Sequence, residues 1–280
     1  MSIDPEANGR HAAEEFRAEH RLGDQPLGDL ITIIEQTVGV DIAVLDVHAA
    51  EHGMTMRDPR FGTTIIAVAK TPHPMRQRST LAHELAHVLF EDAGTPASTT
   101  VDGSAPNDVE ERATAFARHL LIPQQGLTQM LSADMPFGEA DLSRIVQRFL
   151  VSPQLALVAL RQRRIVIPGN AEAWERIRTP DLATKYGWMD QYRQLQADSD
   201  SPRAPQLLLS RATRGYQAGV LGAGAIARLR GVTVDAIEQE FREAGVVPDR
   251  LESSDDPLPM VTLNDDELDE LLGNGPEPAS

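Results

Sequence analysis

The 280-residue sequence contains no cysteine, so it can form no disulfide and can offer no thiolate ligand to a metal. Any metal site in this chain therefore has to be built from histidine and carboxylate side chains. The sequence also lacks an apolar run of roughly 18 residues, and its first residues have no apolar stretch typical of a secretory signal. We therefore expect a cytoplasmic protein without membrane contact.

Aromatic residues and positive charge are both scarce. Aromatic residues make up 4% of the sequence, so the core must be mainly aliphatic. The 42 acidic residues outnumber the 26 basic ones, which gives a formal net charge of −16. A general nucleic-acid-binding protein needs a basic surface, so this balance argues against that class. Nine of the acidic residues fall in 251–280, which has no lysine or arginine and is expected to be a disordered tail.

The most informative stretch is RSTLAHELAHVLF, residues 78–90. Apolar residues recur in it at helical spacing, and a serine–threonine pair at 79–80 offers a helix cap. On one helix His83 and His87 would project from the same face and could bind one ion, and neutral imidazole suits Zn²⁺. Glu84 would then lie beside the open coordination position, where a metallopeptidase needs its general base.

Two histidines leave at least one ligand to be found. Residues 107–122 read as a second helix, whose small alanines would let it approach the first one closely. Glu110 lies beside its apolar side and is our choice for the third ligand. Glu111, about 100° further round the helix, is the alternative. His119 falls half a turn away in helical phase from Glu110, so we interpret it as a surface or packing histidine.

The connection between these two helices, residues 91–106, is rich in small, polar and turn-forming residues. A loop of this length inside a domain is often functional or mobile. Two interpretations stay open, a substrate-binding lip beside the metal and a disordered insertion.

Before the histidine helix the pattern predicts a helix over 6–21, a second over 27–38, and strands over 42–47 and 63–69. Glycines between the two strands allow turns, so we expect a small antiparallel sheet. The order is helix, short sheet, histidine helix.

After residue 123 the pattern is helical. Residues 139–150 and 153–163 read as a helix-turn-helix-like pair, and 205–245 read as an all-helical module. Two-helix hairpins are mostly packing units, so DNA contact is not expected despite the arginines of the first pair.

At this point the sequence resembles the ImmA/IrrE family of metallopeptidases. The family hallmark is an arginine five residues before an A-H-E-x-x-H helix, followed by E-x-x-A-N-x-F-A-x-x-L-L-x-P. The first block corresponds to 78–90. The second corresponds to Glu110-x-x-Ala113-Thr114-x-Phe116-Ala117-x-x-Leu120-Leu121-x-Pro123. The similarity is clear over 27–125 and looser to about residue 166.

Carried over position by position, the resemblance implies that His83, His87 and Glu110 bind zinc and that Glu84 activates water. Three positions depart from the family pattern, and none of them is a ligand. They are Ser79 in place of an aromatic residue, Ala86 in place of glycine and Thr114 in place of asparagine.

The expected fold class is α+β, a mainly helical, zincin-like peptidase core with a small antiparallel sheet and an all-helical C-terminal module. We divide the chain into a helical N-terminal extension (1–26), the zinc peptidase core with its trailing helix pair (27–168), the C-terminal module (169–250) and the acidic tail (251–280).

Family members typically cleave a cognate helix-turn-helix transcriptional repressor or act beside one. The resemblance thus implies a zinc endopeptidase, with Mn²⁺ as an alternative metal and a repressor or antitoxin protein as substrate. The rival hypothesis is a regulator that binds such a protein stoichiometrically and uses its metal for structure only. Three residues remain open as the second donor to the transition-state oxyanion: His73, Arg78 and Tyr216.

Overall fold

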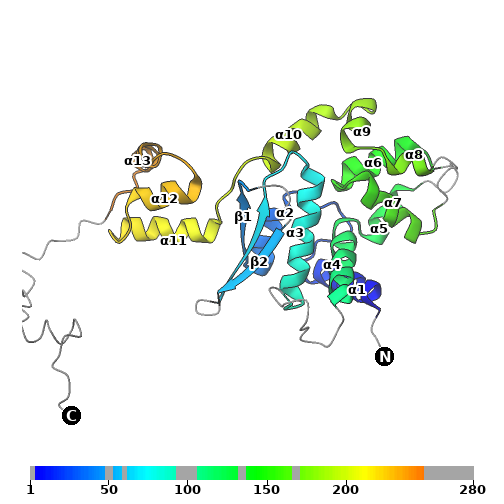
Figure 1. Ribbon diagram of the computed structural model, residues 1–280, viewed down its shortest axis with the longest axis horizontal. Helices are drawn as coiled ribbons and strands as arrows, with labels where there is room; N and C mark the ends of the chain where they lie inside the picture. The colour runs from blue at the N-terminus through cyan, green and yellow to red at the C-terminus, as the bar shows by residue number, and fades with distance from the viewer. Residues whose placement is uncertain are drawn as a thin grey trace, which may run out of the picture.

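The computed structural model describes residues 4–47, 53–58, 62–92, 106–131, 137–165 and 171–248. Within these ranges the chain forms 13 helices and one three-stranded sheet (Figure 1). The predicted α+β class with a mainly helical composition is confirmed. The predicted acidic tail and most of the predicted loop before the second ligand helix lie outside the described residues.

The N-terminal half, in chain order, consists of α1 (Pro5–Glu19), α2 (Leu30–Val38), β1 (Asp41–Leu45), β2 (Gly53–Asp58), β3 (Thr63–Ala69), α3 (Pro74–Leu89), α4 (Pro106–Leu121) and α5 (Gln124–Met130). The C-terminal half consists of α6 (Glu139–Phe149), α7 (Pro153–Gln162), α8 (Ala171–Glu175), α9 (Thr179–Lys185), α10 (Met189–Ser199), α11 (Gln206–Gln217), α12 (Ala223–Arg230) and α13 (Val234–Glu243). None of the described helices is both long and apolar enough to cross a membrane.

The sheet has the order β1-β3-β2. The two strands predicted from the sequence, β1 and β3, are neighbours, but they run parallel, so the predicted antiparallel pairing of these two is wrong. The antiparallel partner of β3 is β2, from Gly53↔Val68 to Asp58↔Thr63. The chain turns back twice between β1 and β3, and an even number of reversals leaves those two strands parallel. The sequence GMTMRD of β2 has little strand propensity, which is why the strand was missed.

Helix α3 lies between the sheet and α4 (Figure 1). It begins at Pro74 rather than at the predicted cap at 79–80, because proline at the first helical position presets the backbone angle and needs no hydrogen-bond acceptor. The Ser79 hydroxyl instead donates to the carbonyl of Met75 inside the helix. Most of the large, fully buried side chains of the main core come from the sheet, α2, α3, α4 and α6, among them Ile34, Ile42, Ile66, Leu81, Leu85, Phe116, Leu120 and Phe149.

Arg78 fixes the position of α3. Its guanidinium is buried and donates hydrogen bonds to the carbonyls of Leu27 and Gly28, both at 2.6 Å, and of Leu150 at 3.2 Å. Burial lowers the pKa of this guanidinium to about 10, so it stays charged at neutral pH. One side chain thus ties the start of the histidine helix to two distant backbone segments.

Helix α1 packs along α4. Gly9 lies so close that a β-carbon there would collide with the carbonyl of Arg112, so the two backbones are in direct contact. At one end of the contact the Glu6 carboxylate pairs with Arg118 and with His119 Nε2, the latter at 2.9 Å. Near the end of α1 the buried Arg17 donates to backbone carbonyls, including that of Leu120, which follows His119 on α4, at 2.9 Å. The histidine interpreted as a surface or packing residue is therefore buried in an ion-pair cluster.

The side chains of α8–α10 contribute to the main core, notably Trp174, Leu182, Trp188 and Tyr192. A second, smaller cluster is formed by α11–α13, which Figure 1 shows as a group beyond β1. Both members of the predicted helix pair, α6 and α7, are present. The packing shows which segments share a core. The division of the chain into domains stays a prediction.

The two outer strands differ in what lies beside them. On β1, Val44 exchanges two backbone hydrogen bonds with Arg203, at 2.8 and 2.9 Å. The buried carboxylate of Asp41 accepts from the amides of Leu207 and Leu208 at the start of α11, both at 2.9 Å. Among the described residues no strand pairs with the outer edge of β2.

The Glu6 cluster makes stability depend on pH. Burial alone would raise the pKa of the Glu6 carboxyl, but hydrogen bonds from Arg118 and His119 outweigh it and hold that pKa below its usual value. A lowered folded-state pKa adds stability above the unfolded-state pKa of about 4.3, and this stability is lost as the pH falls through the folded-state value.

We expect Glu6→Ala to reduce the free energy of unfolding at neutral pH by about 1–3 kcal/mol, because Arg118 would stay buried without its carboxylate. Denaturant unfolding from neutral pH down to about pH 4 should show the difference from wild type shrinking on acidification. Glu15→Ala is the control, since Glu15 is an exposed residue of the same helix. Equal stability of Glu6→Ala and wild type at neutral pH would contradict the assignment.

Candidate metal centre

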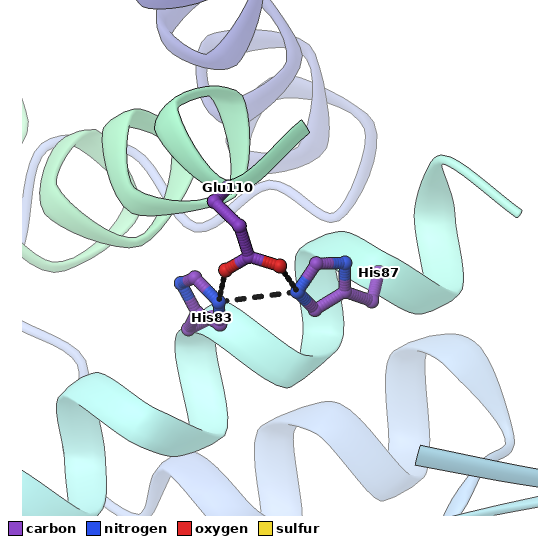
Figure 2. Close-up of side chains that lie close together, drawn as sticks. All are labelled: His83, His87 and Glu110. Atoms are coloured by element: carbon purple, nitrogen blue, oxygen red, sulfur yellow. Dashed lines mark hydrogen bonds and ion pairs between the residues drawn. The ribbon is translucent and has the colours of Figure 1, made fainter. Parts of the chain in front are cut away.

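The residues predicted to form the site come together on two neighbouring helices. His83 and His87 project from one face of α3, and α4 directs the Glu110 carboxylate at both rings (Figure 2). The His83 Nε2 atom lies 3.1 Å from His87 Nε2 and 3.1 Å from Glu110 Oε2, and His87 Nε2 lies 3.6 Å from Glu110 Oε1. One ligand atom from each residue can be chosen so that all three lie within 4.8 Å of one another.

These separations fit a tetrahedral ion. Ligand atoms at about 2.0–2.1 Å from a tetrahedral Zn²⁺ lie about 3.3 Å from one another. The two Nε2 atoms are 3.1 Å apart, and each has one of the two Glu110 oxygens near this distance, Oε2 at 3.1 Å from His83 and Oε1 at 3.6 Å from His87. Two imidazoles and one carboxylate are a donor set that zinc accepts. Three protein ligands leave one coordination position for water or substrate, which is the arrangement of catalytic rather than structural zinc sites. That the three residues bind a metal stays a prediction.

The alternative third ligand, Glu111, is exposed and is not part of the cluster formed by the described residues. The choice of Glu110 over Glu111 from helical phase therefore agrees with the positions of the two side chains. Glu110 is itself more than half exposed, since 63% of its side chain is accessible. It would be a solvated surface acid without the two imidazoles opposite it.

The two histidines have different electrostatic surroundings. Burial and the neighbouring His87 lower the pKa of the His83 imidazole, which favours its neutral form. Burial acts in the same direction on His87, but the hydrogen bond and charge of Asp92 outweigh it and raise the pKa of this imidazole. Neutral imidazole is the form that binds a metal, so protons compete for His87 more strongly than for His83.

Asp92 and Arg112 were not identified from the sequence. The His87 Nδ1 atom lies 2.8 Å from Asp92 Oδ1, and the Arg112 guanidinium donates to Asp92 Oδ2 at 2.8 Å. Burial alone would raise the pKa of the Asp92 carboxyl, but its hydrogen bonds to His87 and Arg112 bring that pKa below the usual value. Only the short separation of Asp92 from His87 along the chain could have indicated this contact.

The predicted general base, Glu84, is nearly buried, with 9% of the residue exposed. Its Oε2 atom accepts a hydrogen bond from the Thr55 hydroxyl at 2.8 Å. Gly53, on the same strand, leaves no room beside it, because a β-carbon there would lie 2.6 Å from Thr80 Cγ2 and 2.7 Å from Glu84 Oε1. Strand β2 therefore confines this carboxylate. Neither Thr55 nor Gly53 could be identified from the sequence, because β2 was not predicted.

None of the three residues considered as oxyanion donors is placed for that role. Arg78 already donates to the backbone carbonyls of Leu27, Gly28 and Leu150. His73 precedes α3, and the ten residues to His83 correspond to about 15 Å along the helix. Tyr216 packs against Phe241 in the second cluster, with ring centroids 4.8 Å apart.

The comparison with known families agrees with this geometry. Residues 35–161 match the family model of the IrrE N-terminal-like domain, Peptidase_M78. The chain contains an ImmA/IrrE family domain. The matched segment runs from within α2 to within α7 and includes every residue of the candidate site. Helix α1 and the helices from α8 onward lie outside the part that matches the ImmA/IrrE domain. No curated protein matches the chain.

The choice between the two neighbouring acids can be tested directly. We expect Glu110→Ala to weaken zinc binding by more than about 100-fold, the upper range for changes outside the ligand shell, because it removes one of three ligands. Glu111→Ala, one position away and exposed, should bind zinc like wild type. Chelator competition with purified protein measures both affinities. Equal zinc affinities for the two variants would remove Glu110 from the site.

Proposed function

We propose that the protein is a zinc-dependent endopeptidase that cleaves a helix-turn-helix repressor or an antitoxin protein. The observation that carries the proposal is the combination of three converging ligand atoms with a confined carboxylate, Glu84, that is not one of them. A structural zinc site has four protein ligands and needs no unligated carboxylate beside it. The domain family supports metallopeptidase chemistry, and Mn²⁺ is the alternative to zinc.

The roles of the residues follow from their positions. A divalent ion held by His83, His87 and Glu110 would supply Lewis-acid chemistry for amide hydrolysis. Glu84 would accept the proton of the attacking water and pass it to the leaving nitrogen. The Thr55 hydroxyl occupies Oε2 of that carboxylate, which leaves Oε1 for the proton. Burial of Glu84 against β2 keeps its side chain in one orientation through both transfers.

The outer edge of β2 supports a polypeptide as the substrate class. Its backbone groups have no strand partner among the described residues, and β2 lies along α3 beside Glu84. An unpaired edge can bind an extended peptide through main-chain hydrogen bonds with little dependence on sequence. The choice of a repressor or antitoxin as the particular substrate rests on the family resemblance.

Glu84→Gln tests the catalytic role. The variant should keep its zinc and lose at least about 100-fold in cleavage rate, because the amide cannot accept the proton. Zinc-loaded wild type and variant would each be incubated with a lysate of the source cells, and new protein N-termini would be identified by mass spectrometry. We expect new termini with wild type only, in a protein with a helix-turn-helix domain.

The rival function predicts another outcome of that experiment. A stoichiometric regulator would capture the same intact protein with wild type and with Glu84→Gln, and neither would generate new termini. That result would exclude the endopeptidase and favour a structural metal.

Gly53→Ala tests the confinement of the base. The added methyl group would displace Glu84 or Thr80, so we expect roughly a ten-fold loss of cleavage rate with unchanged zinc content. Met54→Ala is the matched control, since it removes an exposed side chain from the next position of the same strand. Equal cleavage rates for Gly53→Ala and Met54→Ala would show that β2 does not hold Glu84 in place.

A further inference from the structure

We infer that Asp92, held in place by Arg112, is the residue that positions His87 for metal binding. Asp92 takes part in two short hydrogen bonds: its Oδ1 lies 2.8 Å from His87 Nδ1, and its Oδ2 accepts from the Arg112 guanidinium, also at 2.8 Å. All three side chains are largely buried, with exposed fractions of 13%, 6% and 9%. The inference rests on the metal site of the proposed function, but not on the peptidase reaction.

The two ring nitrogens of His87 have separate partners. Nε2 faces His83 and Glu110, so it must carry a free electron pair to bind a metal. The proton of the neutral ring then belongs on Nδ1, and the Asp92 carboxylate, which can only accept, selects that tautomer. A hydrogen bond at this position also fixes the rotation of the ring and makes Nε2 a better donor.

The backbone brings Asp92 to His87 through a left-handed turn at the end of α3. Glu91 has a φ of 55°, a conformation that glycine adopts far more readily. The amide of Glu91 donates to the carbonyl of Val88, and the amide of Asp92 donates to the carbonyl of His87, both at 3.2 Å. These two hydrogen bonds form a Schellman motif without glycine. Glu91, next to Asp92, therefore adopts a backbone conformation that is unfavourable for a residue with a side chain.

Arg112 connects this turn to the other ligand helix. It follows Glu110 by two positions on α4. Its guanidinium donates to Asp92 and also lies 4.1 Å from the centre of the Phe90 ring. An arginine over an aromatic face is attracted to it, so the side chain has two anchors at the end of α3. The ion pair therefore aligns His87 with the helix that supplies the third ligand.

Zinc affinity, measured by chelator competition with zinc as the only added ligand, tests this role of Asp92. The full chain is used, at a temperature well below its melting temperature. We expect Asp92→Ala to weaken zinc binding by about 10–100-fold. Asp92→Asn keeps an acceptor for Nδ1–H but loses the charge, so its affinity should lie between those of Asp92→Ala and wild type. Asp41→Asn is the control for loss of a buried carboxylate, because Asp41 caps α11 and touches no ligand. It should bind zinc like wild type.

A change in the turn that precedes Asp92 provides a further control. Glu91→Gly should be at least as stable as wild type and bind zinc equally well, because it relieves the turn without moving Asp92. Wild-type zinc affinity in Asp92→Ala or in Asp92→Asn would overturn the inference, and the second variant serves if the first does not fold. A wild-type chain that binds zinc but cleaves no protein would refute the endopeptidase while leaving the role of Asp92 standing.

Discussion

The candidate site depends on how closely α3 and α4 approach each other. Two ligands stand on one helix and the third on the other, so the distance between the helices sets the distances between ligand atoms. Both helices bury alanine, at Ala82 and Ala86 on α3 and at Ala113 and Ala117 on α4. Small side chains let helix axes come near the lower end of the usual 8–10 Å range. The sheet supports α3 from the opposite side and keeps it against α4 (Figure 1).

The helices and the ligand cluster could be predicted because they depend on local periodicity. Positions i and i+4 of a helix face the same way whatever surrounds them, so the histidine pair required no tertiary information. Choosing Glu110 over Glu111 required only helical phase and the assumption that the apolar sides of two helices meet. The cap at 79–80 was wrong because Pro74 starts the helix five residues earlier.

The sheet and the contacts around the ligands could not be predicted in the same way. Strand β2 is stabilised by pairing with β3 and by packing on α3, not by its own composition, and the direction of β1 relative to β3 follows from its presence. Thr55 and Gly53 reach Glu84 only through that pairing. Asp92 reaches His87 only because Glu91 adopts a left-handed backbone, which a glutamate in a sequence does not indicate.

Helix α1 has a consequence for how this domain is delimited. The family match begins at residue 35, yet α1 lies directly against the backbone of α4, and Phe16 belongs to the main core. Cutting the chain at the start of the matched segment would uncover Phe116 and Leu120 and would remove the acceptor of Arg118. The segment that matches the family model is thus shorter than the packed unit in which α4 holds the third ligand.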